Sequence, residues 1–158
     1  MRVPRIYLET SIFNFYFADD APDKKRDTLK LFEEIKKGLY APYTSEYVFF
    51  ELRRADEPKQ SQMIELTDRY GVMLLESSVE VDRLAQIYVN EGIIPARHFI
   101  DAAHIATTTV HDLDFIVSYN FQHIVKRKTV TMTEAVNLRE GYKRIGIFSP
   151  TEVIESDE

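Results

Sequence analysis

The sequence alternates short apolar runs with longer stretches of helical character, and this alternation restricts the fold more than any other feature. The runs have the length and composition of buried strands and span residues 5–8, 39–44, 72–75, 115–118 and 144–148. Between them, apolar residues at helical spacing or helix-start and helix-stop residues occur at 22–38, 45–52, 58–70, 77–92 and 95–106. We therefore predict an α/β fold, a three-layer α/β/α sandwich with a central, mainly parallel sheet of four to five strands.

Length and composition indicate one globular domain. We expect it to span residues 1–154, followed by an acidic tail at 155–158, because 158 residues can bury a single core. Hydrophobic residues make up 44% and charged residues 29% of the chain, which is typical of soluble globular proteins. No apolar run approaches the roughly 18 residues that span a bilayer, and no signal-peptide core follows the start, so we expect a cytoplasmic protein without a membrane partner.

Charge and the lack of cysteine exclude several classes of function. Acidic residues outnumber basic residues by 26 to 20, so a nucleic-acid partner needs a local basic patch or bridging cations. Because the chain contains no cysteine, disulfides, thiolate zinc sites and cysteine nucleophiles are excluded. The five glycines form no phosphate-binding loop, and no Gly-x-Ser-x-Gly elbow is present.

Four polar residues stand where an α/β sheet places its ligand site or where a packing surface is expected. Glu9 ends the first predicted strand and Asn120 follows the fourth, although either residue alone can be an ordinary cap. Glu51 and Asp101 interrupt apolar helical stretches, and an ionised carboxylate removed from water costs several kcal/mol unless it is paired or binds a metal.

Buried ion pairs are the alternative explanation for the two helical carboxylates. Glu51 can pair with Arg54 at i,i+3, and Arg97 can pair with Asp101 at i,i+4. For each position alone, an ion pair and a functional role remain equally open. Taken together, the oxygen donors from two strand ends and two helices suit a hard cation, Mg²⁺ or Mn²⁺.

These positions, in this order, resemble the PIN-domain family. The resemblance covers residues 5–154 and rests on four motifs: Ile-Tyr-Leu-Glu-Thr-Ser at 6–11, Ser-Glu-Tyr-Val-Phe-Phe-Glu-Leu at 45–52, Asp-Ala-Ala-His-Ile-Ala at 101–106 and Ile-Val-Ser-Tyr-Asn-Phe at 116–121. It is nearest to a branch with VapC-like toxins, in which an aromatic-Asn-Phe-x-His-Ile motif precedes Asn-Leu and Gly-Tyr elements, as at 119–124, 137–138 and 141–142 here.

The resemblance implies a PIN-like fold and a metal-dependent endoribonuclease that hydrolyses RNA phosphodiester bonds. It further implies a toxin restrained by a small antitoxin protein, and a homodimer. Asp101 and Glu9 would be direct ligands of the metal, and Glu51 would act directly or through water. Asn120 would hold a metal-bound water or a phosphate. Supporting hydroxyls would come from Thr10, Ser11 and Ser118.

Two departures from the family pattern bear on catalysis. Glu9 stands where the family usually has aspartate, and its side chain is one methylene longer. Asn120 is neutral where many relatives carry aspartate, so the site has three formal negative charges. We therefore expect one firmly held metal ion and a second metal ion that binds only together with the substrate phosphate. The alternative function is therefore a catalytically silent PIN-like module that binds RNA or protein.

Other polar motifs are weaker. Asp101-x-x-His104 could present two ligands from one helix face, but no Glu-x-x-His unit accompanies it, so we expect His104 to be a packing or supporting residue. His98, His111 and His123 lie at no recognised metal-binding spacing. The basic run Lys126, Arg127 and Lys128 is a candidate contact for an RNA backbone, and a solvated charged turn is its alternative interpretation.

Overall fold

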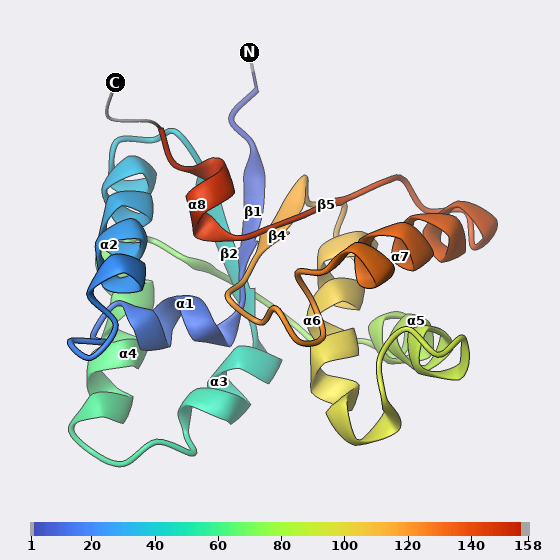
Figure 1. The fold of residues 1–158 in the computed structure, drawn as a ribbon, viewed down its shortest axis with the longest axis horizontal. Helices are drawn as coiled ribbons and strands as arrows, with labels where there is room; N and C mark the ends of the chain where they lie inside the picture. The colour runs from blue at the N-terminus through green and yellow to red at the C-terminus, as the bar shows by residue number, and fades with distance from the viewer. Residues whose placement is uncertain (1, 156–158) are drawn as a thin grey trace.

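A computed structural model describes residues 2–155, which form an α/β fold around one five-stranded sheet (Figure 1). The strands are β1 (Arg5–Leu8), β2 (Ala41–Ser45), β3 (Met73–Leu75), β4 (Phe115–Val117) and β5 (Gly146–Phe148). They are arranged in the order β3-β2-β1-β4-β5, and every pairing is parallel. The predicted fold class is confirmed, and the strand bounds differ from the expected ones by no more than two residues.

The central strand β1 explains why the site forms where it does. Ile6, Tyr7 and Leu8 are completely buried, because β2 and β4 flank the strand and helices cover both faces of the sheet. Tyr7 is in register with Tyr43 of β2 and Ile116 of β4. All five strands run in one direction, so their carboxyl ends lie along a single edge.

Helices cover the sheet from two sides, with α2 and α4 on one side and α5, α6 and α7 on the other in Figure 1. The helices are α1 (Thr10–Phe15), α2 (Pro22–Lys36), α3 (Glu46–Leu52), α4 (Lys59–Arg69), α5 (Val79–Asn90), α6 (Phe99–Val110), α7 (Arg127–Arg139) and α8 (Pro150–Val153). A 3₁₀ turn, Ala96–His98, precedes α6. Helices α5 and α6 pack extensively against each other. No helix among the described residues is long and apolar enough to cross a membrane.

Three of these helices, α1, α7 and α8, lie outside the predicted set. The buried face of α7 consists of Thr129, Thr133, Val136 and Asn137, so the apolar periodicity that marks a helix is missing there. The charged-turn interpretation of the basic run is wrong for Arg127 and Lys128, which begin α7, while Lys126 is its N-cap. Of the expected acidic tail, the structure describes only Glu155, whose backbone N–H donates to Glu34 Oε2 at 3.0 Å.

Candidate metal centre

Side chains from β1, α3 and α6 meet beyond the carboxyl ends of β1, β2 and β4. Glu9 follows β1 directly and is the N-cap of α1, where its side chain accepts from the Ser11 backbone N–H. Glu51 lies in the last turn of α3, and Asp101 lies in the first turn of α6. One ligand atom each of Glu9, Glu51 and His104 lie within 4.8 Å of one another. The fold thus brings residues from distant parts of the chain to one place.

Glu9 is held through one of its two carboxylate oxygens. The residue is only 4% exposed, and its Oε1 accepts from the Ser11 N–H at 3.1 Å, from Ser11 Oγ at 2.5 Å and from Ser118 Oγ at 2.7 Å. Among the residues from 2 to 155, no donor reaches Oε2, which is therefore available to a ligand. The two hydroxyls are themselves fixed, because Ser11 Oγ accepts from Tyr119 N and Ser118 Oγ accepts from Asn120 N.

Glu51 is positioned by a chain of buried hydrogen bonds. Its Oε1 accepts from Thr10 Oγ1 at 2.5 Å and lies 2.6 Å from His104 Nε2. The other nitrogen of the completely buried His104, Nδ1, lies 2.6 Å from Tyr7 Oη, which lies 2.7 Å from Ser45 Oγ. His104 therefore supports Glu51, as one of the two sequence interpretations expected. A zinc or iron ligand pair with Asp101 would require breaking one of these bonds.

The electrostatics of Glu51 and His104 are those of a buried pair. Burial alone disfavours the charge on both, but the pKa of His104 is raised because the carboxylates of Glu51, Glu9 and Asp101 outweigh it. The pKa of Glu51 is lowered, since the bonds from His104 and Thr10 outweigh the effect of its burial. The expected alternative, an ion pair of Glu51 with Arg54, is not among the ion pairs of the described part of the chain, although Arg54 does lower the pKa of Glu51.

The negative charges of Asp101 and Glu9 are only partly compensated by their neighbours. The pKa of both residues is raised, mainly by burial, and the charge on Glu51 adds to the effect at Asp101. The expected ion pair of Asp101 with Arg97 is likewise missing from residues 2–155, where the ionic neighbour of Asp101 Oδ2 is His98 Nδ1 at 3.9 Å. A site with three carboxylates and only one cationic partner at hydrogen-bond distance is short of positive charge.

Asn120 stabilises the turn after β4 and also contacts Asp101. Its Oδ1 accepts from the His123 backbone N–H at 3.0 Å and holds the turn after β4. Its side chain also forms a hydrogen bond with Asp101 that lowers the pKa of that carboxyl group. Oδ1 thus already accepts one hydrogen bond, and the NH₂ group of Asn120 donates hydrogen bonds and does not bind metals.

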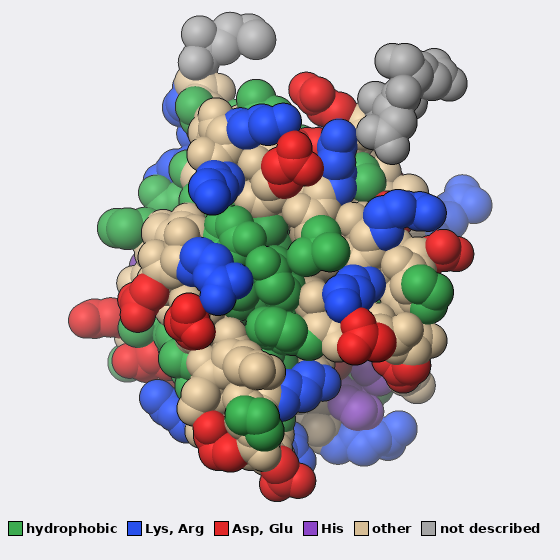
Figure 2. All heavy atoms as spheres, turned by 90° about the vertical axis from the view of Figure 1, so that its left-hand side faces the viewer, with side chains coloured by type: hydrophobic (Ala, Val, Ile, Leu, Met, Phe, Trp, Pro, Cys, Tyr) green, Lys and Arg blue, Asp and Glu red, His purple; other side chains and the backbone are tan. Residues whose placement is uncertain are grey.

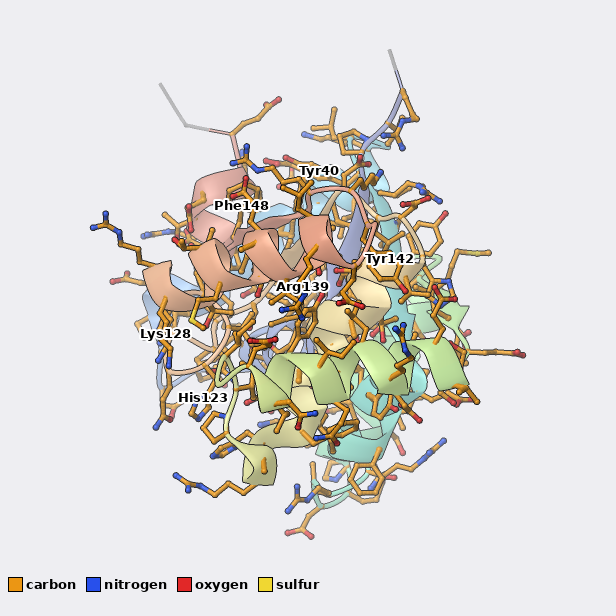
Figure 3. The ribbon with its side chains drawn as sticks, turned by 90° about the vertical axis from the view of Figure 1, so that its right-hand side faces the viewer. Tyr40, His123, Lys128, Arg139, Tyr142 and Phe148 are labelled. Atoms are coloured by element: carbon orange, nitrogen blue, oxygen red, sulfur yellow. The ribbon has the colours of Figure 1, made fainter. Side chains whose placement is uncertain are left out.

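The site opens to solvent through a cleft of about 170 Å³, lined by Glu51, Arg54, Arg97, His98, Phe99, Ile100 and Asp101. The carboxylates at its floor are hard oxygen donors of the kind that Mg²⁺ and Mn²⁺ accept. Lys126, Arg127 and Lys128 are exposed near the same edge of the molecule. Figure 3 shows Lys128 and His123 at the same end of α7.

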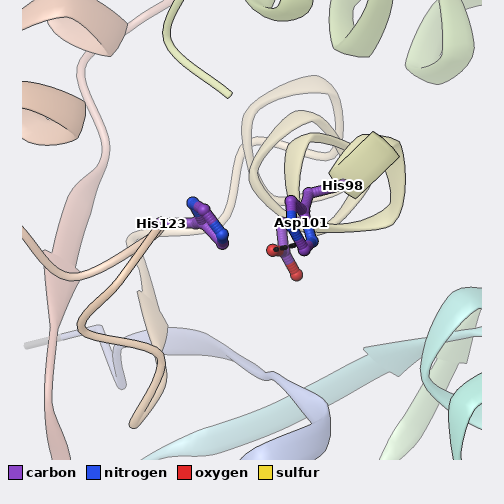
Figure 4. Close-up of side chains that lie close together, drawn as sticks. All are labelled: His98, Asp101 and His123. Carbon is purple, nitrogen blue, oxygen red and sulfur yellow. Dashed lines mark ion pairs between the residues drawn. The ribbon is translucent and has the colours of Figure 1, made fainter. Parts of the chain in front are cut away.

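The structure corrects the interpretation of two histidines. Their spacing suggested no metal site, yet His98 and His123 lie together, with ring centroids 4.2 Å apart and Asp101 beside them (Figure 4). The two residues are 25 positions apart, and only the fold brings the start of α6 to the turn after β4. No local sequence signal could have indicated this proximity.

Comparison with known proteins supports the fold. No family model and no curated protein matches the chain. Among solved structures, this chain is similar to VapBC2 from Rickettsia felis, which was determined in complex with a DNA fragment from its promoter. The TM-score is 0.53 and the sequence identity is 16%, and the match covers 73% of this chain and 88% of the other chain. At this level of identity the likeness shows the fold alone, and it agrees with the PIN-like arrangement of an all-parallel sheet between helices.

Proposed function

We propose that this protein is a metal-dependent endoribonuclease of the PIN-domain kind, with Glu9, Glu51 and Asp101 as the ligands of Mg²⁺ or Mn²⁺. The observation that carries the proposal is that the largely buried Glu9 and Glu51 offer ligand atoms within 4.8 Å of each other, while the charge of Glu51 acts on the buried Asp101. No lysine or arginine among residues 2–155 forms an ion pair with any of the three carboxylates. Buried carboxylates persist in proteins when a partner or a metal compensates their charge. The donor set fits a hard divalent cation.

The residues around the carboxylates fix their positions in advance. Ser11 and Ser118 hold one oxygen of Glu9, and Thr10 and His104 hold one oxygen of Glu51, so the ligands lose little conformational freedom on binding. This arrangement accommodates the longer side chain of Glu9. A bound Mg²⁺ or Mn²⁺ supplies neutralising charge for the phosphodiester and lowers the pKa of a water molecule.

Two further features suit an RNA substrate. The NH₂ group of Asn120 can donate to a phosphate oxygen or to a water molecule beside Asp101. A groove of about 520 Å³, lined in part by Phe49 and Phe50, shares Ile100 with the cleft that Glu51 and Asp101 line. Phe50 is 56% exposed, and such aromatic surfaces stack on nucleobases. We assign Lys126, Arg127 and Lys128 to the RNA backbone.

For partners we propose a small antitoxin protein and a second copy of this chain. The structural neighbour VapBC2 is a two-component complex, which supports a protein partner for this chain as well. Figure 2 shows an apolar area ringed by lysine, arginine, aspartate and glutamate side chains on the face seen from the left of Figure 1. Apolar areas with a polar rim are typical of protein interfaces.

The test is cleavage of a panel of RNAs by the purified chain with Mg²⁺, with Mn²⁺ and with EDTA. We expect metal-dependent cutting that Asp101→Asn abolishes. Asp114→Asn is the matched control, because Asp114 precedes β4 at the opposite edge of the sheet, where it binds Arg5 N and Arg2. If no divalent cation supports cleavage while the chain still binds RNA or a protein, the silent-module alternative replaces the nuclease.

A further inference from the structure

A second group of metal-ligating side chains lies on the outer side of Asp101. It consists of His98, Asp101 and His123, each of which offers a ligand atom within 4.8 Å of the others. Figure 4 shows the ring of His123 on one side and His98 with Asp101 on the other, directed toward one another. His98 Nδ1 lies 3.9 Å from Asp101 Oδ2, so two of the three already interact.

The backbone positions these residues independently of any ligand. His98 closes the 3₁₀ turn and is the N-cap residue of α6, which places Asp101 three residues later on the same side of the first turn. His123 is held from both directions, since its N–H donates to Asn120 Oδ1 at 3.0 Å and its carbonyl oxygen accepts from Thr129 Oγ1 at 2.7 Å. The turn after β4 is thus fixed against the start of α6.

One nitrogen of His123 lacks a partner. The residue is only 9% exposed, and its Nε2 is buried without a hydrogen-bond partner in residues 2–155. A buried polar atom without a partner costs free energy, and native proteins rarely retain one without a reason. The nearest ring is His98, which contributes its face and not a donor or acceptor bond. A ligand that approaches in the plane of the His123 ring would satisfy this nitrogen.

We propose that His98, Asp101 and His123 form a binding site for Zn²⁺ or a similar divalent first-row transition ion. Two imidazole nitrogens and one carboxylate oxygen are a common three-residue ligand set for zinc, and they leave a further position for water. Tetrahedral zinc with bonds of about 2.0–2.1 Å places ligand atoms about 3.4 Å apart. His98 Nδ1 and Asp101 Oδ2 are 3.9 Å apart, and the 37% exposed side chain of His98 can rotate to shorten this distance. His123, whose backbone is fixed by Asn120, does not have to move.

The nitrogen ligands distinguish this site from the carboxylate site beside it. Imidazole favours Zn²⁺, Ni²⁺ and Co²⁺, whereas Mg²⁺ prefers oxygen and keeps most of its water. Asp101 has two oxygens and stands between the sites, so each can use it. Binding of a transition ion to the histidines does not depend on the proposed nuclease activity and remains testable if the chain cuts no RNA.

The experiment titrates ZnCl₂ and CoCl₂ into the full chain with excess Mg²⁺ present, followed by calorimetry and by the visible spectrum of Co²⁺. We expect saturable binding of one equivalent with a spectrum of nitrogen and oxygen ligands. Loss of a residue that only supports a metal ligand weakens metal binding by about 10- to 100-fold. His98→Gln and His123→Gln each remove a direct ligand, so each should weaken Zn²⁺ binding by at least this factor. Thermal melts verify that both variants remain folded.

Two other variants separate this proposal from the proposed function. His111→Gln, at the far end of α6, should leave the Zn²⁺ affinity unchanged. Glu51→Gln removes a ligand of the carboxylate site alone and only a neighbouring charge of Asp101, so it should change the Zn²⁺ affinity by much less than either His98→Gln or His123→Gln. Unchanged affinity in both His98→Gln and His123→Gln overturns the proposal, as does an absence of saturable binding. If Glu51→Gln loses Zn²⁺ binding while the His98 and His123 variants keep it, the ion binds at Glu9, Glu51 and His104, and this result also overturns the proposal.

Discussion

Replacing Asp101 with asparagine should stabilise the metal-free protein and at the same time remove its response to Mg²⁺. Asp101 is 8% exposed, and its pKa is raised above the ordinary value of 3.8, first by burial and then by Glu51. Because the pKa of Asp101 is higher in the folded protein than in the unfolded chain, the protonated group favours folding below pH 3.8. This contribution to stability is lost as the pH rises through the pKa of the folded protein. At pH 7 the ionised carboxylate therefore opposes folding, and the neutral isostere does not.

The expected gain is about 1 kcal/mol, in the range usual for relieving a functional-site cost. For a chain of this size, that gain corresponds to a rise of about 2–4 °C in Tm. Mg²⁺ at a hundredfold excess over its Kd should stabilise the original protein by about 2.7 kcal/mol, because the ion binds only the folded state. The order of stabilities should therefore reverse when Mg²⁺ is added.

The assay is thermal unfolding of both proteins at pH 7, first in EDTA and then in a Mg²⁺ series, with Asp114→Asn as the control. The control should be less stable than the original protein under both conditions and should respond to Mg²⁺ in full. The reasoning is refuted if Asp101→Asn is less stable than the original in EDTA, or if Mg²⁺ stabilises the two proteins equally. Near pH 3, the gain measured in EDTA should disappear.

Three further predictions concern the hydrogen bonds behind the site, the opposite edge of the sheet and the RNA contact. Tyr7→Phe leaves Ser45 Oγ and His104 Nδ1 without their shared partner, so urea unfolding should show a loss of about 1–3 kcal/mol, and an unchanged midpoint would contradict the buried chain of hydrogen bonds. The pKa of Asp114 is lowered, because the bonds from Arg5 N and Arg2 outweigh its burial. Asp114→Asn should therefore cost about 1 kcal/mol at pH 7, and the loss should shrink as the pH falls through the lowered pKa, whereas an equal loss at all pH values would speak against these bonds. A triple variant with alanine at Lys126, Arg127 and Lys128 should bind a labelled single-stranded RNA with a weaker dependence on salt concentration. The slope of log K against the logarithm of the salt concentration should fall by about 0.7 for each phosphate that the variant no longer neutralises. An identical slope would show that these residues do not contact the RNA.

The sheet could be predicted because its strands form short apolar runs, of which the central strand β1 is buried on both faces. Ile6, Tyr7 and Leu8 form a short apolar run of the kind that only a covered strand produces, and the helices between the strands end at glycine or begin at proline or serine. Helix α7 could not be predicted in this way, since threonine and asparagine form its buried face. Helix α1 has only six residues, too few to show a period.

The carboxylates could be singled out because Glu9 ends an apolar strand and the other two interrupt apolar helical segments. Glu51 and Asp101 stand out in otherwise apolar helical segments. The fold brings Glu51 beside Glu9, and the charge of Glu51 reaches Asp101. The partners of these residues could not be predicted, because they depend on tertiary contacts. Nothing at position 104 indicates that this histidine links Tyr7 to Glu51, and neither His98 nor His123 carries a local sign of the other.

The carboxylate metal site is tested most directly by anomalous diffraction from a crystal of this protein soaked in MnCl₂. We expect a manganese peak bounded by the carboxylates of Glu9, Glu51 and Asp101, with Glu9 binding through Oε2 while Ser11 and Ser118 keep Oε1. A crystal saturated with Mn²⁺ that shows no peak among these three side chains would contradict the assignment of the site.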